Sequence, residues 1–164
     1  MKILLDSVNE WNLKTVMEIE RSSFSLSEAA SISAMKQRQH QIPETFLGAF
    51  VNFKLVGFIV GPAISRRYLT DDLFSSVTKN FSANQAPYQA VLSLAVAPAY
   101  RKKGIASQLL QAIIAQAQDA GRQGVTLTCL PTLITFYQKN GFQDEGIAES
   151  KHADETWHNL FLQL

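Results

Sequence analysis

Apolar and polar positions alternate along the chain in two distinct periods. Two apolar runs, Phe46 to Val51 and Leu55 to Val60, are separated by three residues and are typical of a β-hairpin. Shorter apolar runs bounded by Pro, Gly or polar residues predict further strands at 3–5, 91–97, 125–129, 142–148 and 156–162.

Helices are predicted where apolar residues recur three and four positions apart. The clearest helix has Ile105, Leu109, Ile113 and Ala117 on one face and ends at Gly121. Other helical segments are predicted at 12–22, 27–40, 72–77 and 133–141. The resulting order, β-α-α-β-β-β-α-β-α-β-β, predicts an α/β domain with a mixed sheet, because hairpins and crossovers both occur.

Length and composition predict one domain over residues 1–164. Hydrophobic residues make up 46% of the chain and charged residues 18%, which excludes an intrinsically disordered protein. The net charge of +1 gives no strong field toward nucleic acid or an acidic membrane. We therefore expect neither as a partner.

Cys129 is the only cysteine, so an internal disulfide is excluded and a structural zinc site is not expected. The longest apolar stretch, residues 55–64, is too short to span a bilayer, and the apolar start is too short for a signal peptide. We expect a cytoplasmic monomer or homodimer without a bound metal.

The most informative segment is the basic turn between the strand at 91–97 and the long helix. Backbone N–H groups at a helix start lack internal partners and lie at the positive end of the helix dipole, which favours phosphate. Gly104 lets the backbone approach an anion, and small Ala106 and Ser107 keep the approach open. Positive charge is added by Arg101, Lys102 and Lys103. An ordinary basic turn before an amphipathic helix has the same pattern.

This turn resembles a known motif. Arg101-x-x-Gly104-x-Ala106, after Leu94-Ala95-Val96, is similar to the acetyl-CoA pyrophosphate loop of the GNAT acetyltransferase superfamily. Residues 136–142, FYQKNGF, resemble that family's FYxxxGF segment. Within the superfamily, three parts of the chain resemble the serotonin (arylalkylamine) N-acetyltransferase group and its bacterial relatives. They are residues 18–21 before Phe24-Ser25, residues 127–129, and Phe136-Tyr137 with Trp157.

The resemblance covers nearly the whole chain and implies a GNAT fold, whose central strands splay apart to admit the pantetheine arm of acetyl-CoA. It implies that the backbone of Leu94, Ala95 and Val96 pairs with that arm, with the Val96 amide facing the thioester oxygen. The pyrophosphate would be bound by the amides of Lys102, Lys103, Gly104, Ile105, Ala106 and Ser107.

Tyr137 shares a predicted helix face with Leu133 and Phe136. By periodicity alone it is a core tyrosine with a bonded hydroxyl. The resemblance implies instead a general acid that protonates the leaving CoA thiolate, and a phenol with a pKa near 10 suits a thiolate of similar basicity.

The general base is not identified by the sequence. Serotonin acetyltransferases have two histidines before the Leu-Ala-Val segment, but Ala90 and Leu92 occupy the matching positions here. The proton of the amine then leaves through solvent, or through water that ends at backbone or a carboxylate. Among His40, His152 and His158, only His152 is placed in a segment that could fold back over a cleft.

Several residues have both a functional and an ordinary interpretation. Phe24, Leu26 and Phe74 are candidates for an apolar substrate wall, or are plain core residues. Asp71 and Asp72 either attract a cationic amine or are solvated loop acids. Cys129 is expected to be a buried, inert thiol, because the family transfers the acetyl group directly in a ternary complex.

Together these features predict an N-acetyltransferase that uses acetyl-CoA as co-substrate and no metal. The expected acceptor is a small primary amine, including arylalkyl amines. Two alternatives stay open: acetylation of a protein N-terminus or lysine, and a non-catalytic acyl-CoA-binding sensor that uses the same loop.

Overall fold

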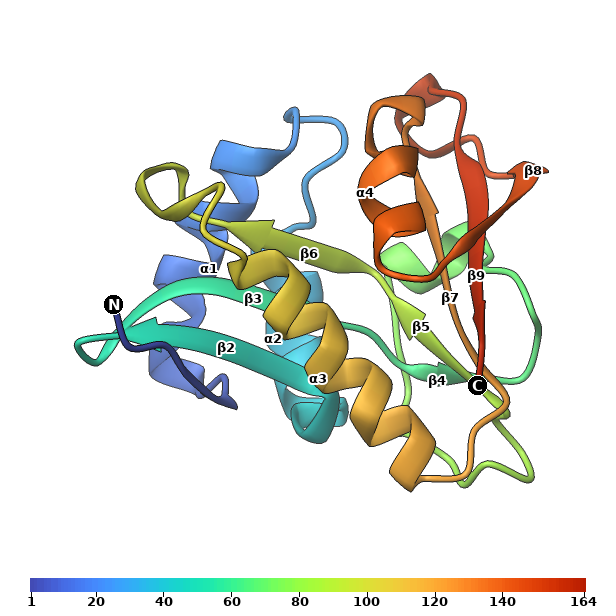
Figure 1. The fold of residues 1–164 in the computed structure, drawn as a ribbon, viewed down its shortest axis with the longest axis horizontal. Coiled ribbons are helices and arrows are strands. Elements are labelled where there is room, and N and C mark those ends of the chain that lie inside the picture. Colours follow the sequence, from blue (N-terminus) through green and yellow to red (C-terminus); the bar gives the residue numbers. More distant parts are fainter.

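The computed structural model of the protein describes residues 1–164 as nine strands and four α-helices (Figure 1). The strands are β1 (Leu4–Ser7), β2 (Phe46–Val51), β3 (Lys54–Val60), β4 (Ala63–Ile64), β5 (Tyr88–Val91), β6 (Ser93–Val96), β7 (Gly124–Cys129), β8 (Gln143–Ile147) and β9 (His158–Gln163). The helices are α1 (Leu13–Ser23), α2 (Ile32–Gln41), α3 (Ile105–Asp119) and α4 (Ile134–Lys139).

The strands form two sheets that diverge. One has the order β1-β2-β3-β6 and the other the order β4-β5-β7-β9-β8. β5 pairs in parallel with β7 as far as Val91 opposite Leu127, whereas β6 pairs with β3 alone. β6 and β7 therefore separate beyond Val91, as Figure 1 shows. This is the splay that the GNAT resemblance implies.

The division between β5 and β6 lies at a β-bulge. Leu92 and Ser93 both lie opposite Val60: the Leu92 N–H donates to the Val60 carbonyl at 2.8 Å, and Ser93 is the register partner of Val60. A bulge bends its strand and interrupts the ladder. The single strand predicted over 91–97 is therefore wrong, and its bend directs β6 away from β7.

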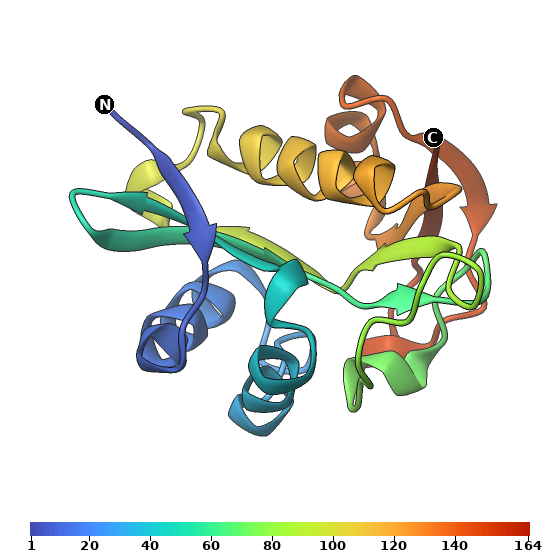
Figure 2. The same cartoon turned by 90° about the horizontal axis from the view of Figure 1, so that it is seen from below.

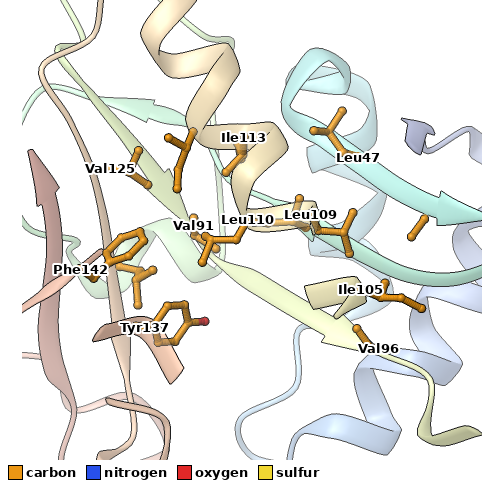
Figure 3. Packing of buried hydrophobic residues seen from close by; sticks show 14 of the residues in the cluster. Leu47, Val91, Val96, Ile105, Leu109, Leu110, Ile113, Val125, Tyr137 and Phe142 are labelled. Atoms are coloured by element: carbon orange, nitrogen blue, oxygen red, sulfur yellow. The ribbon is translucent and has the colours of Figure 1, made fainter. Parts of the chain in front are cut away.

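The helices cover both faces of the sheets. α1 and α2 lie on one face and α3 on the other (Figure 2). Leu109, Leu110 and Ile113 of α3 are fully buried against the strands, which confirms the amphipathic pattern of this helix (Figure 3). A second cluster packs α1 and α2 against the opposite face and includes Val16, Met35, Phe46 and Phe58.

Local predictions differ from the structure in two further places. α2 begins at Ile32, with the Ser31 hydroxyl accepting the Ala34 N–H at 3.1 Å, and not at Ser27. Residues before it form a turn in which the Glu28 carboxylate accepts the Ser25 N–H at 2.8 Å. The helix expected over 72–77 is a single 3-10 turn, Asp71–Phe74. No helix has the length and apolar character needed to cross a membrane.

Candidate active site

A cavity of about 540 Å³ occupies the space where the two sheets diverge. Its walls come from α1, α2, the 71–75 turn, the β5–β6 bulge, the end of β7, α4 and the segment before β9. Residues of α1 and of the segment before β9 therefore meet at this cavity.

Backbone groups of β6 face the diverging space. The Ala97 N–H donates to the Val56 carbonyl at 2.8 Å, in register with Gly57 opposite Val96. Because antiparallel pairs alternate between bonded and non-bonded positions, the amides of Leu94 and Val96 point away from β3. The same alternation turns the backbone groups of Ala95 toward β3, so Ala95 has none free for an extended ligand, which corrects the expectation for this residue.

The turn before α3 presents a row of free donors. The backbone N–H groups of all six residues from Lys102 to Ser107 have no acceptor in the protein, and the first bonded amide is that of Gln108, at 3.1 Å from the Gly104 carbonyl. Gly104 has φ +82°, and a Cβ placed on it would meet nothing within 4 Å. Glycine is thus required by the left-handed backbone, and the space beside it is open to an anion.

Arg101 connects this turn to two other elements. Its Nε donates to the Val96 carbonyl at 2.9 Å, and its Nη2 lies 3.2 Å from the Ser22 carbonyl and 3.1 Å from the Ser23 hydroxyl. These acceptors are neutral, so Arg101 ties the turn to β6 and to the end of α1 and keeps its positive charge. Lys102 and Lys103 are exposed.

Tyr137 points into the cavity from α4. Its ring packs edge-on against Phe136 and Phe142, and its hydroxyl points away from Phe142 (Figure 3). Burial, with a smaller effect from Cys129, raises the pKa of the phenol well above its ordinary value of 10. The phenol therefore remains protonated in neutral and moderately alkaline solution, and up to a higher pH than its ordinary pKa of 10 would allow.

Glu20 is the site residue that sequence reasoning missed. Its carboxylate is 1% exposed and lines the cavity. Oε2 accepts the Ala30 N–H at 2.8 Å and the Ser93 hydroxyl at 3.3 Å, while Oε1 has no partner. Burial raises the pKa of Glu20, opposed in part by the Ala30 N–H and by the charge of Arg38. One sequence signal was available: Glu20 lies seven residues after Leu13, on the apolar face of α1.

The histidines are separated in the structure. His152 lines the cavity, stacks on Phe74 with ring centroids 4.6 Å apart, and has Nε2 3.1 Å from the Glu28 carbonyl oxygen. His40 is exposed on α2, and His158 contacts Asp144 at 3.1 Å outside the cavity.

The expected apolar wall is present in part. Phe24 and Phe74 line the cavity, and Trp157 joins them. Leu26 is 93% exposed, because it lies at the tip of the turn before α2, so its assignment to the wall is wrong. Asp71 also lines the cavity, but its carboxylate accepts the Ser150 hydroxyl at 2.5 Å and the Lys151 N–H at 3.0 Å. Asp72 lies outside this cavity.

Residues 43–144 match the family described as acetyltransferase (GNAT) domain. The chain belongs to the GNAT acetyltransferase family. It is 32% identical over 137 residues to serotonin N-acetyltransferase of Mesocricetus auratus, a match that covers 80% of this chain and 63% of that protein. The chain thus matches less than two thirds of the length of this relative.

Solved structures show the same fold at low identity. Ard1 from Thermoplasma volcanium superposes with a TM-score of 0.79 at 20% identity, covering 100% of this chain and 99% of Ard1. Arabidopsis thaliana Naa50, solved in complex with the bisubstrate analogue CoA-Ac-MVNAL, superposes with a TM-score of 0.75 at 17% identity, covering 100% of both chains.

The GNAT site has the donors that a CoA thioester needs. The free amides of residues 102–107 suit a pyrophosphate, and the outward amides of β6 suit an extended amide-bearing arm. The cavity of about 540 Å³ also has apolar side chains in its lining, together with Tyr137.

Cys129 contributes a buried free thiol to this cavity. It lines the cavity, and burial, with a smaller effect from Asp144, raises its pKa to about 12. The thiolate is the nucleophilic form, so attack by Cys129 is disfavoured at neutral pH. No three His, Cys, Asp or Glu side chains lie together as a metal-binding group.

Proposed function

We propose that the protein transfers the acetyl group of acetyl-CoA to a primary amine. One arrangement carries this proposal: the six free amides of residues 102–107 lie at the start of α3, shortly after β6, whose outward amides border the divergence of strands where Tyr137 lines the cavity. The first group suits a pyrophosphate, the second an extended arm, and the third a leaving sulfur. A phosphate-binding turn alone would need neither of the other two.

Binding is assigned to backbone donors. The amides from Lys102 to Ser107 bind the pyrophosphate, and those of Leu94 and Val96 bind the pantetheine arm and the thioester oxygen. When bound, acetyl-CoA supplies an acyl carbon activated by its thioester. Arg101 fixes the turn to β6, so that both sets of donors keep one relative position.

Transfer requires a proton donor for the leaving group. The amine nitrogen bonds to the acyl carbon as the carbon–sulfur bond breaks, and Tyr137 gives its phenolic proton to the sulfur. Because burial keeps the phenol protonated, the donor is present throughout the neutral range. Cys129 takes no part, since its thiol stays protonated, and transfer is direct.

The proposed acceptor is a small primary amine, including arylalkyl amines. Phe24, Phe74 and Trp157 offer aromatic surface in the cavity, and the relative from Mesocricetus auratus is a serotonin N-acetyltransferase. Segments over the cavity are also joined: Asp71 bonds to Ser150 and Lys151, and His152 stacks on Phe74. A protein chain would have to displace these contacts, whereas a small amine would not.

A panel of acceptors tests the acceptor class. Phenethylamine, tryptamine, a polyamine, a lysine peptide and a peptide with a free N-terminus are each incubated with acetyl-CoA, and kcat/KM is measured from thiol release. We expect the arylalkyl amines to exceed both peptides by at least about tenfold, because only they fill the aromatic wall. A peptide as the best acceptor would contradict the proposed class and favour protein acetylation.

A further inference from the structure

The proposed reaction lacks a proton acceptor for the amine. An alkylamine has a pKa near 10, so only about 0.1% is neutral at pH 7. The nucleophile must be the neutral form, since the ammonium has no lone pair. A carboxylate or imidazole beside the bound amine would accept its proton, so that the reaction would not depend on the small neutral fraction in solution.

Glu20 lies beside the open edge of β6, which is proposed to bind the thioester. Its Oε2 is 3.3 Å from the hydroxyl of Ser93, and the next residue, Leu94, has its amide on the open edge of β6. α1 packs below β6, while Tyr137 reaches the same cavity from α4. Glu20 and Tyr137 therefore approach the thioester position from two different elements.

Glu20 also has an unused acceptor atom. Oε1 is buried and has no hydrogen-bond partner, whereas Oε2 is fixed by the Ala30 N–H and Ser93. A buried carboxylate oxygen without a donor is unfavourable by itself and is typical of functional sites. An ammonium or amine N–H in the cavity would supply the missing donor.

We propose that Glu20 is the proton acceptor of the acetyl transfer. This inference rests on the proposed function. Arg38 is 1% exposed, lines the same cavity, and donates to the Phe74 carbonyl at 3.1 Å without a direct contact to Glu20. The positive charge of Arg38 opposes part of the rise in the pKa of Glu20 that burial causes.

The protons of the proposed reaction balance between Glu20, Tyr137 and solvent. Glu20 takes one proton from the bound ammonium and leaves a neutral amine. The nitrogen lone pair forms the carbon–nitrogen bond, the carbon–sulfur bond breaks, and Tyr137 protonates the sulfur. The nitrogen's second proton returns to the Tyr137 oxygen, directly or through water, and Glu20 releases its proton to solvent.

Other ionisable groups of the cavity are less suited to this role. His152 has its Nε2 against the Glu28 carbonyl, Asp71 is bonded to Ser150 and Lys151, and Cys129 stays a thiol. Glu28 also has a buried oxygen without a partner, Oε2, but its side chain is only half-buried, and its Oε1 accepts the Ser25 N–H in the turn before α2. Glu20 alone combines burial, a free oxygen and contact with the bulge residue Ser93.

The test compares Glu20→Gln with Glu18→Gln, an exposed glutamate of the same helix. Two acceptors are used: ethylamine and 2,2,2-trifluoroethylamine, whose three fluorines make its ammonium far more acidic, so that it needs no base to become neutral at pH 7. We expect Glu20→Gln to lower kcat/KM for the alkylamine by about 10²–10⁴-fold and for the fluorinated amine by less than about tenfold. CoA affinity, measured by calorimetry, and all rates of Glu18→Gln should stay near wild type.

Equal losses with both amines would overturn the assignment, because the loss of a purely structural residue would lower the rate by the same factor for a weakly and a strongly acidic ammonium. Wild-type rates in Glu20→Gln would also overturn it. If this variant does not fold, the wild-type pH profile decides: kcat should rise through one acidic limb that persists in His152→Gln. Loss of that limb in His152→Gln would make His152 the base. A wild-type protein that binds CoA but acetylates no amine would refute the proposed function, and this inference with it.

Discussion

The guanidinium of Arg101 donates to the carbonyl oxygen of Val96 at 2.9 Å, so the turn that leads into α3 is tied to the end of β6. The same guanidinium reaches the last residues of α1, which contains Glu20. One side chain thus connects the turn proposed to bind pyrophosphate, the strand proposed to bind the pantetheine arm, and the helix that contains Glu20.

Removal of this tie should weaken cofactor binding through geometry. Arg101→Met keeps an unbranched apolar stem and removes the donors, and hydrogen bonds from a charged group contribute about 1.5–3 kcal/mol each. We expect the Kd for CoA to rise at least about tenfold, measured by calorimetry. Lys103→Met removes the same charge from an exposed position and should change Kd less than about threefold. Equal effects of the two variants would mean that Arg101 acts only through its charge.

Gly104 should matter more than the neighbouring positive charge. Valine at φ +82° is strained, and its side chain would occupy the open space beside the free amides. Gly104→Val should weaken CoA binding by more than about tenfold, whereas Lys102→Ala should change it about twofold. Calorimetry in low and high salt separates the two effects. Small and similar losses in both variants would contradict binding through backbone donors.

Tyr137→Phe tests the proton donor. The ring and its contacts with Phe136 and Phe142 remain, and only the hydroxyl is lost. We expect kcat to fall by about 10²–10⁴-fold with nearly unchanged CoA affinity. Since burial raises the pKa of this phenol, the wild-type rate should show no loss of the acid near pH 10. Normal turnover in the variant would make Tyr137 a core residue only.

Stability should change with pH in the direction opposite to that of an ordinary ion-paired carboxylate. Burial raises the pKa of Glu20 above its value in the unfolded chain, so the folded state binds more protons over that interval. The free energy of unfolding therefore falls as pH rises through the interval from about 4.5 to the raised value, and the loss persists above it.

Glu20→Gln should accordingly be more stable than wild type at pH 7 and no more stable below about pH 4. A gain on the order of 1 kcal/mol would raise Tm by about 2–4 °C in a chain of this size. Thermal unfolding at both pH values measures this. A variant less stable than wild type at pH 7 would show that the charged form of Glu20 stabilises the fold.

The backbone part of the site was predictable because its signals are local. Gly104 between basic residues and the α3 periodicity identify a turn and a helix start within a few residues, and the orphan amides follow from that geometry. Tyr137 was placed inward by helical spacing. These features need no knowledge of which distant segments meet.

Side-chain contacts over long sequence separations were not predictable in the same way. Glu20 meets Ser93, and Arg101 meets Ser22 and Ser23, more than 70 positions away along the chain. Leu26 was assigned to the wall by its apolar character, but a turn exposes it. The bulge at Leu92 depends on the pairing of Val60 with two residues, which the apolar run 91–97 does not indicate.

The most direct test of the account is the release of thiol from acetyl-CoA by the purified protein with and without an arylalkyl amine, alongside mass spectrometry of the amine. We expect thiol release that depends on the amine, saturates with it, and equals the acetylated amine formed. Tight CoA binding with no amine-dependent release across the panel would contradict acetyl transfer and would favour a non-catalytic acyl-CoA-binding sensor.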